Sequence, residues 1–246
     1  PDSTAVQGGG SLLDNHPNAS YTFDGTSDHV DIADHDEINE SIVSHRTIEL
    51  WFNAPAVPDT WTTKRVLFEE GGGTNGINLF LSGGLLHAGL WENESGDWLT
   101  APVRDNQTYH VVLRYDGDPA AANGSLTGYI NGQVFGTATV TNELKSHGGD
   151  IALGAYQNDT RYSDGEGISG DGAYFDGTID EFALYNDALT EARVGGHFAT
   201  GGGDTIPIIM HDLLLDYRAE EASAGLLPNV HGTYGTGGSN SQSRLD

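Results

Sequence analysis

The chain has 246 residues and carries 36 acidic residues against 10 basic ones, which gives a formal net charge of −26. Such a surface repels nucleic acid and anionic membranes, and no apolar run approaches the roughly 18 residues of a membrane-spanning helix. The lack of cysteine excludes disulfides and thiolate metal sites. Only two lysines occur, Lys64 and Lys145, and carboxylates are spread along the whole chain. We therefore expect a halophilic source, where salt screens self-repulsion.

Alternating apolar residues predict most of the secondary structure. In the segment 47–52, Ile48, Leu50 and Phe52 fall on one face, because successive side chains of a strand point to opposite faces. Similar short runs recur along the chain, bounded by Gly, Asp and Asn. We expect strands at 47–52, 77–81, 85–91, 109–115, 126–130, 133–140, 151–156 and 179–185.

Turn signals separate these strands. Asn131-Gly132 joins two such runs and is typical of a two-residue β-hairpin, because both turn positions require a positive φ. Asp116-Gly117 closes another strand with similar turn chemistry. A helical pattern is confined to one or two turns at 187–193. Many short strands and almost no helix predict an all-β sandwich or barrel.

The chain changes character near residue 200. Residues 201–207 contain a run of glycines and predict a hinge, and the segment 208–246 holds a strand-like run and a Gly/Ser-rich tail. We therefore divide the chain into a β-sandwich at 1–200, the hinge at 201–207 and a C-terminal strand segment at 208–246. In this last segment we expect a strand that pairs with a sheet through Leu213, Leu215 and Tyr217.

Several segments, taken in order, are similar to one known family. The motif Phe-Asp-Gly-Thr stands at 23–26 and again at 175–178, each time entering a strand-like run. Between them lie the runs 47–52 and 109–117, and then Tyr129-Ile130-Asn131-Gly132. Together these residues resemble laminin G-like, concanavalin A-like lectin/glucanase domains over about residues 20–198. The resemblance implies a jelly-roll sandwich of two antiparallel sheets, commonly a binding or adhesive module.

One part of the family pattern is displaced. Such domains usually begin with a strand before the first Phe-Asp-Gly, and here the matching pattern stands at 213–221 and 227–234. Three arrangements account for this. The chain is a circular permutant whose last strand completes its own sheet in cis, a polymer subunit whose last strand fills a neighbour's edge in trans, or a fragment of a tandem array. The sequence leaves all three open.

The resemblance also implies a cation site, because the first and last strands of a jelly roll pair and bring their acidic turns together. Calcium takes about six to eight oxygen ligands, which carboxylates and carbonyls supply. The predicted ligands are Asp24, the Gly25 carbonyl, Asp176 and Asp180. The alternative is that Asp-Gly serves only as turn chemistry.

Two sets of residues bear on sugar binding and sugar cleavage. Trp61, Trp91 and Trp98 lie near Asp or Asn residues and are candidate glycan contacts, although tryptophans in sandwiches are more often core residues. Glucanases use paired carboxylates on one strand, and the nearest match is Glu92, Glu94 and Asp97. Their turn-like surroundings indicate a solvated loop, so we expect no enzymatic activity.

The pattern Asn-x-Ser/Thr occurs six times, where composition predicts roughly two by chance. The excess is typical of a glycosylated surface protein, with acceptors at Asn18, Asn39, Asn93, Asn106, Asn123 and Asn158. We therefore expect an extracellular, cell-surface protein with a structural or adhesive role, which forms filaments by exchanging its C-terminal strand. The alternatives are a monomeric glycan-binding module and, third, a glycoside hydrolase.

Overall fold

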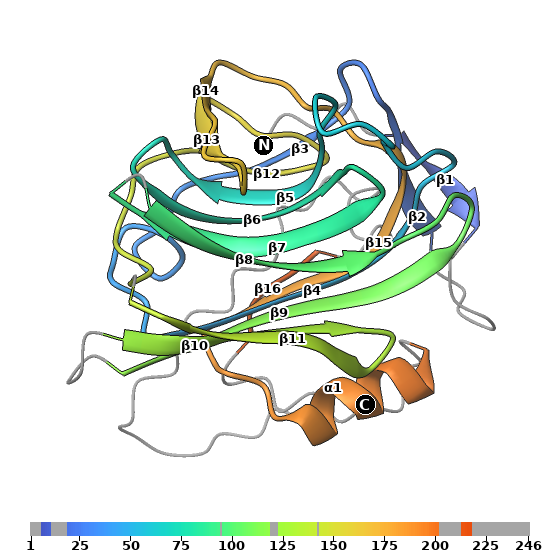
Figure 1. Cartoon of the computed structure of the whole chain (residues 1–246). Coiled ribbons are helices and arrows are strands. Elements are labelled where there is room, and N and C mark those ends of the chain that lie inside the picture. The colour runs from blue at the N-terminus through green and yellow to red at the C-terminus, as the bar shows by residue number, and fades with distance from the viewer. Residues whose placement is uncertain are drawn as a thin grey trace, which may run out of the picture.

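Two antiparallel sheets face each other in the computed structural model, which describes residues 6–10, 19–93, 95–118, 123–141, 143–201 and 213–217 (Figure 1). The eight-stranded sheet has the order β1-β2-β15-β4-β9-β10-β11, and β16 pairs with β15 beside this path. The six-stranded sheet has the order β3-β12-β5-β6-β7-β8, and β13–β14 form a separate hairpin. This is the all-β jelly-roll sandwich that the resemblance implied.

The larger sheet consists of β1 (Val6–Gly10), β2 (Ala19–Asp24), β4 (His45–Asn53), β9 (Thr108–Asp118), β10 (Asn123–Ile130), β11 (Gln133–Val140), β15 (Asp176–Tyr185) and β16 (Leu213–Tyr217). The smaller sheet consists of β3 (Val30–Ile32), β5 (Arg65–Gly71), β6 (Asn75–Ser82), β7 (Leu85–Glu92), β8 (Ser95–Pro102) and β12 (Ile151–Leu153). The remaining elements are β13 (Asp159–Arg161), β14 (Gly167–Ser169) and α1 (Glu191–Thr200).

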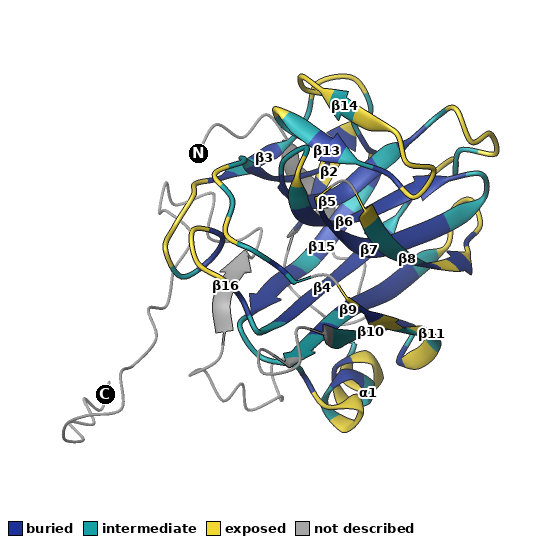
Figure 2. Cartoon of the chain, turned by 60° about the vertical axis from the view of Figure 1, so that its left-hand side comes forward, coloured by how far each residue is buried: buried dark blue, intermediate teal, exposed yellow. Residues whose placement is uncertain are grey.

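Strand β4 shows how the alternating pattern builds the core. Ile48, Leu50 and Phe52 are fully buried between the two sheets. The other face of β4 is also covered, because Trp51 stacks on Phe198 of α1 with ring centroids 5.8 Å apart. The helix therefore packs on the outside of the eight-stranded sheet, as Figure 1 shows. In Figure 2 the buried residues follow the strands of both sheets, whereas β14 and much of α1 are exposed.

The hairpin predicted at Asn131-Gly132 joins β10 to β11. Asn131 has a φ of 50° and Gly132 a φ of 73°, the positive values that this turn requires. The Asn131 side chain also accepts a hydrogen bond from the His110 amide at 3.0 Å, which ties the turn to β9. The hairpin prediction is confirmed.

The helix is longer and begins later than predicted. The pattern indicated 187–193, whereas α1 spans Glu191–Thr200 and is capped at its N-terminus by the Thr190 side chain. Gly195 and Gly196 lie in the middle of α1, and glycine is a poor helix former, so the second half is not visible in local propensity. Within the described ranges, no helix is long and apolar enough to cross a membrane.

Strand β8 lies where the sequence indicated a solvated loop. Glu92 closes β7 and is buried: it accepts a hydrogen bond from the Glu143 amide at 2.9 Å and pairs with Lys145. Asp97 lies within β8 and is paired with β7. The loop interpretation is therefore wrong for these two acids, because pairing with β7 forms a strand that the polar composition does not reveal. Glu94 is outside the described residues.

Candidate functional site

Two strands that are far apart in the sequence, β2 and β16, pair with the same edge of β15. Along this edge β2 pairs with residues 176–179, and β16 pairs with residues 182–185. Only Asp180 and Glu181 separate the two paired stretches. Because β16 and β2 are both antiparallel to β15, they follow one another in the same direction and together cover the edge (Figure 1).

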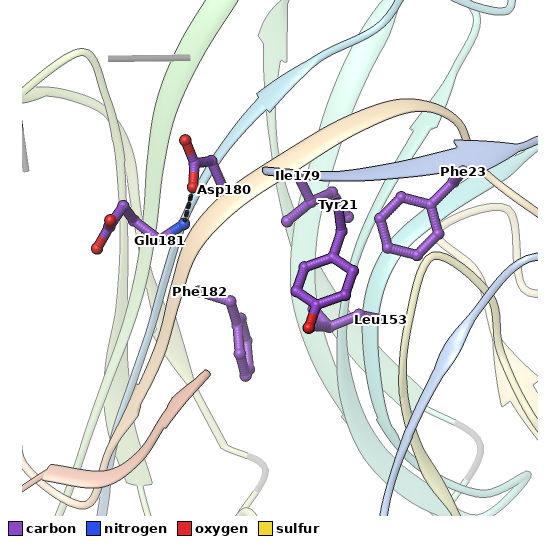
Figure 3. Close-up of a pocket in the computed structure, with 7 residues that line it drawn as sticks. All are labelled: Tyr21, Phe23, Leu153, Ile179, Asp180, Glu181 and Phe182. Carbon is purple, nitrogen blue, oxygen red and sulfur yellow. Dashed lines mark hydrogen bonds between the residues drawn. The ribbon is translucent and has the colours of Figure 1, made fainter. Parts of the chain in front are cut away.

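A small hollow lies at the junction between β2 and β16. Its walls come from β2, β12 and β15, and Figure 3 shows the carboxylates of Asp180 and Glu181 turned away from its aromatic rings. The Asp180 carboxylate accepts a hydrogen bond from the Glu181 amide at 3.0 Å. Glu181 has a φ of 48°, and the register against β4 shifts between Asp180 and Ala183. Strand β15 thus has a bulge between the stretch that pairs with β2 and the stretch that pairs with β16.

The three residues predicted for strand pairing all stand in β16. Leu213 is in register with Tyr185, Leu215 with Leu184, and Tyr217 with Phe182. In this structure β16 therefore pairs in cis, within the sandwich of its own chain. Residues 202–212 and 218–246, which include most of the predicted hinge and tail, lie outside the described part of the chain.

The predicted calcium ligands are only partly brought together. Asp24 and Asp176 are partners across β2 and β15, whereas Asp180 lies farther along β15, at about 13 Å for the rise of a strand. Gly25 has a φ of 71°, and a Cβ there would lie 2.8 Å from the Asp176 Cβ. Gly25 therefore serves the turn and the close approach of the two strands.

The surroundings of Asp24 do not fit a cation. Its Oδ1 accepts hydrogen bonds from the amides of Thr26 and Ser27, both at 2.8 Å, and of Asp28 at 3.0 Å. The Thr26 hydroxyl and these amides hold the pKa of Asp24 well below its usual range. Within the described ranges, no group of three His, Asp or Glu side chains could hold a metal ion. The Asp24 carboxylate is thus bonded to donors of its own turn, and the calcium site stays a prediction.

The three candidate tryptophans differ in exposure. Trp61 is 56% exposed, Trp98 is half-buried and Trp91 is fully buried. The rings of Trp91 and Trp98 stack with their centroids 6.3 Å apart. They lie over glycines of the six-stranded sheet, since a Cβ at Gly76 would lie 2.4 Å from Trp91 and one at Gly89 would lie 2.4 Å from Trp98. The Trp91 ring is therefore inaccessible to a ligand, whereas more than half of Trp61 is accessible.

A stack of side chains holds Trp61 in place. Its ring meets His87 edge-on at 5.5 Å between centroids and packs against Gly83. His87 in turn stacks on Phe80 at 4.5 Å and lies 2.9 Å from the Ser163 hydroxyl through Nδ1. Trp61 is thus a supported, exposed aromatic surface.

An open cavity of about 280 Å³ is lined in part by the residues that directly follow Trp61 in the sequence. It separates the loop that enters β5 from the β13–β14 hairpin, which Figure 1 shows above the outer face of the six-stranded sheet. Residues far apart in the sequence meet here, so local patterns could not predict it. The side chains that matter below are Thr63, Lys64, Arg65, Tyr162, Glu166 and Ile168.

The two cations of this cavity have different partners. Lys64 Nζ lies 2.9 Å from Asp164 and 2.7 Å from Glu166, and 4.8 Å from the centre of the Tyr162 ring. Burial alone would lower the pKa of Lys64, but the two carboxylates raise it and keep the ammonium charged. Arg65 donates to the Lys64 carbonyl at 3.3 Å and forms no ion pair with any described residue.

A second polar cluster anchors the helix. Glu49 of β4 is buried and contacts His110 Nε2 at 2.7 Å and His197 Nδ1 at 2.9 Å. Burial alone would raise the pKa of Glu49, but the bonds to His110 and His197 lower it to about 2. These residues are distant in sequence and no motif marks them. They join α1 to the outer face of the large sheet.

The predicted glycan acceptors are not equivalent. Asn39 is buried and donates to Asp34 at 2.7 Å, so its amide is not accessible to a glycan in this fold. Asn18 and the side chain of Asn123 lie outside the described residues. The exposed acceptors, all at turns with positive φ, are Asn93, Asn106 and Asn158.

Comparison with solved structures identifies the fold. The receptor-binding domain of botulinum neurotoxin type G aligns with a TM-score of 0.55 and 12% identity, covering 79% of this chain and 46% of that one. The ligand-binding domain of serotype D with N-acetylneuraminic acid aligns with a TM-score of 0.57 and 13% identity, covering 89% and 49%. The chain thus spans about half the length of these toxin domains.

A smaller neighbour matches over nearly its whole length. The SAP-like pentraxin from Limulus polyphemus aligns with a TM-score of 0.53 and 17% identity, covering 81% of this chain and 92% of that one. No curated protein sequence matches the chain. A family profile of the laminin G type, described as the concanavalin A-like lectin/glucanases superfamily, matches residues 24–195. The match covers more than half of the sequence, and the chain belongs to this superfamily.

Proposed function

We propose that this protein is a non-catalytic, extracellular component of a cell surface that joins copies of itself by exchanging β16. The observation that supports this is the shared edge of β15, which β2 covers along 176–179 and β16 along 182–185. Without β16, the second stretch would expose the unpaired N–H and C=O groups of an edge strand. A β16 from another copy satisfies the same groups, which is β-strand addition.

The connection to β16 is long enough for exchange. Eleven residues, 202–212, stand between Gly201 and Leu213, and an extended stretch of that length spans about 40 Å. Exchange replaces each cis contact with an identical trans contact, so it costs little beyond the entropy of association. A head-to-tail exchange that does not close on itself produces filaments.

Electron microscopy of the purified chain in molar KCl tests this proposal. We expect filaments or multimers with the wild type and monomers with Leu215→Pro, because proline cannot donate to a ladder. Leu215→Val keeps the donor and serves as the control that should still assemble. A wild type that stays monomeric at all concentrations would refute exchange.

Carbohydrate binding is the second candidate, and one surface favours it. Trp61 is exposed and directly precedes Thr62, which lines the cavity together with Thr63, Arg65 and Tyr162. An aromatic ring, hydroxyls and a charge are the groups that suit a sugar. One structural neighbour, the ligand-binding domain of botulinum neurotoxin serotype D, was solved in complex with N-acetylneuraminic acid. Glycoside hydrolysis has less support, because the Glu92 carboxylate pairs with Lys145 and accepts a hydrogen bond from the Glu143 amide.

A further inference from the structure

We propose that the cavity between residues 62–65 and the β13–β14 hairpin binds a carboxylate-bearing sugar residue, with Arg65 recognising the carboxylate. This inference rests on the second candidate function, carbohydrate binding, and names its ligand class. It is independent of the proposed strand exchange, because β16 belongs to the other sheet.

Arg65 carries the argument for an acidic ligand. Arg65 is half-buried, lines the cavity and donates to the Lys64 carbonyl, and it forms no ion pair within the described part of a chain that has 36 acidic residues. A guanidinium presents a planar fork of donors that matches a carboxylate with two parallel hydrogen bonds. A cavity-lining guanidinium whose printed hydrogen bond goes to the neutral Lys64 carbonyl is therefore suited to a carboxylate from outside the chain.

The neighbouring charges do not oppose such a ligand. Lys64 contacts the carboxylates of Asp164 and Glu166 within 3 Å, and the charges of Lys64 and Arg65 together balance these two negative charges. The distant carboxylates of the protein act only weakly in molar salt, where the Debye length is about 3 Å. Contacts inside the cavity then decide the affinity, and Arg65 is the available cation.

The rest of the wall is suited to a sugar ring. The hydroxyl of Thr63 and the carboxylate of Glu166 line the cavity and can bond to sugar hydroxyls, and Ile168 supplies an apolar surface. Tyr162 is fully buried, and its hydroxyl has no hydrogen-bond partner within the described ranges. Burial raises the pKa of Tyr162, so this hydroxyl keeps its proton and remains a donor.

The size of the cavity limits the ligand to a short saccharide. A volume of about 280 Å³ lies just below the range of about 300–1,000 Å³ for sites that hold drug-sized molecules. One sugar residue therefore enters the cavity. The next residue of the saccharide then lies outside the cavity. Trp61, which directly precedes the lining residue Thr62 and is 56% exposed, offers it an aromatic ring on which an apolar sugar face can stack.

The test is a titration with two matched probes, methyl β-D-glucuronide and methyl β-D-glucoside, followed by ligand-observed NMR. We expect the wild type to bind the glucuronide at least about tenfold more tightly, because a charge-assisted pair is added. Arg65→Gln should abolish this preference, and Arg65→Lys should retain part of it. Arg104→Gln removes the same charge at an exposed position and should leave the preference intact.

The outcomes separate the two levels of the proposal. Equal binding of both probes by the wild type, or a preference that survives in Arg65→Gln, would overturn the role of Arg65 while carbohydrate binding stands. No binding of either probe would overturn both. If Arg65→Gln fails to fold, the comparison of the two probes on the wild type and on Arg65→Lys still decides the question.

Discussion

Glu69 is an acidic residue in an environment that disfavours its charged form. It is fully buried, and neither carboxylate oxygen has a hydrogen-bond partner within the described ranges. Burial, followed by the nearby charge of Glu70, raises its pKa well above the ordinary value of 4.5. The folded protein therefore holds a proton on Glu69 that the unfolded chain releases more readily.

This proton makes stability depend on pH. Because the folded pKa lies above the unfolded one, the contribution of Glu69 is fully present below about pH 4.5 and is lost as pH rises towards the folded pKa. We expect Glu69→Gln, a neutral isostere, to match the wild type at pH 4.5 and to be more stable at pH 8. Each unit of pKa shift corresponds to about 1.4 kcal/mol. Urea unfolding at the two pH values measures the difference, and an equal offset at both would contradict it.

Asparagines show what residue types predict and what they do not. Asn131 was placed in a turn from the Asn-Gly pair, and the structure confirms it. Asn93, Asn106 and Asn158 also take positive φ, so turn geometry accounts for part of the excess of acceptor patterns. Asn39 is buried, and its side chain donates to the Gly149 carbonyl at 3.2 Å, a contact between distant parts of the sequence that no local pattern marks.

At the scale of elements, α1 depends on one carboxylate. Glu49 bonds to His110 and His197 in a buried site, and removing it leaves two imidazoles without their partner. We expect Glu49→Ala to destabilise the protein by roughly 3–5 kcal/mol, the usual effect of breaking a buried pair. Asp59→Ala, at an exposed position, should change stability by less than about 0.5 kcal/mol.

The pH dependence of this cluster has the opposite sign to that of Glu69. The folded pKa of Glu49 is about 2, below its ordinary value of 4.5, so its stabilisation is present above pH 4.5 and is lost as pH falls towards 2. Denaturant unfolding should show the effect of Glu49→Ala shrinking across this range. An effect that stays constant down to pH 2 would show that packing, not charge, holds the helix.

Elements with clear alternation were predictable, and those defined by partners were not. Strand β4 and the β10–β11 hairpin follow from their own residues. Strand β8 forms because it pairs with β7, and its Gly and Asp residues, which are typical of turns, give no strand pattern in the sequence. The cavity near Arg65 joins residues 62–65 to the β13–β14 hairpin across about a hundred positions of sequence, a contact that only the folded chain creates.

For the whole molecule, the net charge of −26 predicts a strong response to salt. Repulsion among carboxylates is screened as the Debye length falls from about 10 Å at 0.1 M to about 3 Å at 1 M. We expect the melting temperature to rise steadily between these concentrations of KCl. Calorimetry measures it, and a melting temperature that does not change or falls would argue against adaptation to high salt.

At the scale of the whole molecule, β2 and β16, which are far apart in the sequence, complete one edge of the same sheet. The displaced family pattern at 213–221 predicted that the last strand supplies a missing first strand, and β16 does pair with β15 in line with β2. The sequence could not decide between cis and trans pairing, because the same residues form the same contacts either way. That choice depends on concentration and on the connection, not on the strand.

Cysteine cross-linking tests the shared edge most directly, since the chain has no cysteine of its own. Ala183 and Asp216 are partners across β15 and β16, at a spacing that a disulfide can bridge. Ala183→Cys with Asp216→Cys should give efficient oxidation and a ladder of covalent multimers on a non-reducing gel. A disulfide confined to the monomer would contradict exchange, and no disulfide at all would contradict the pairing of β16 with β15.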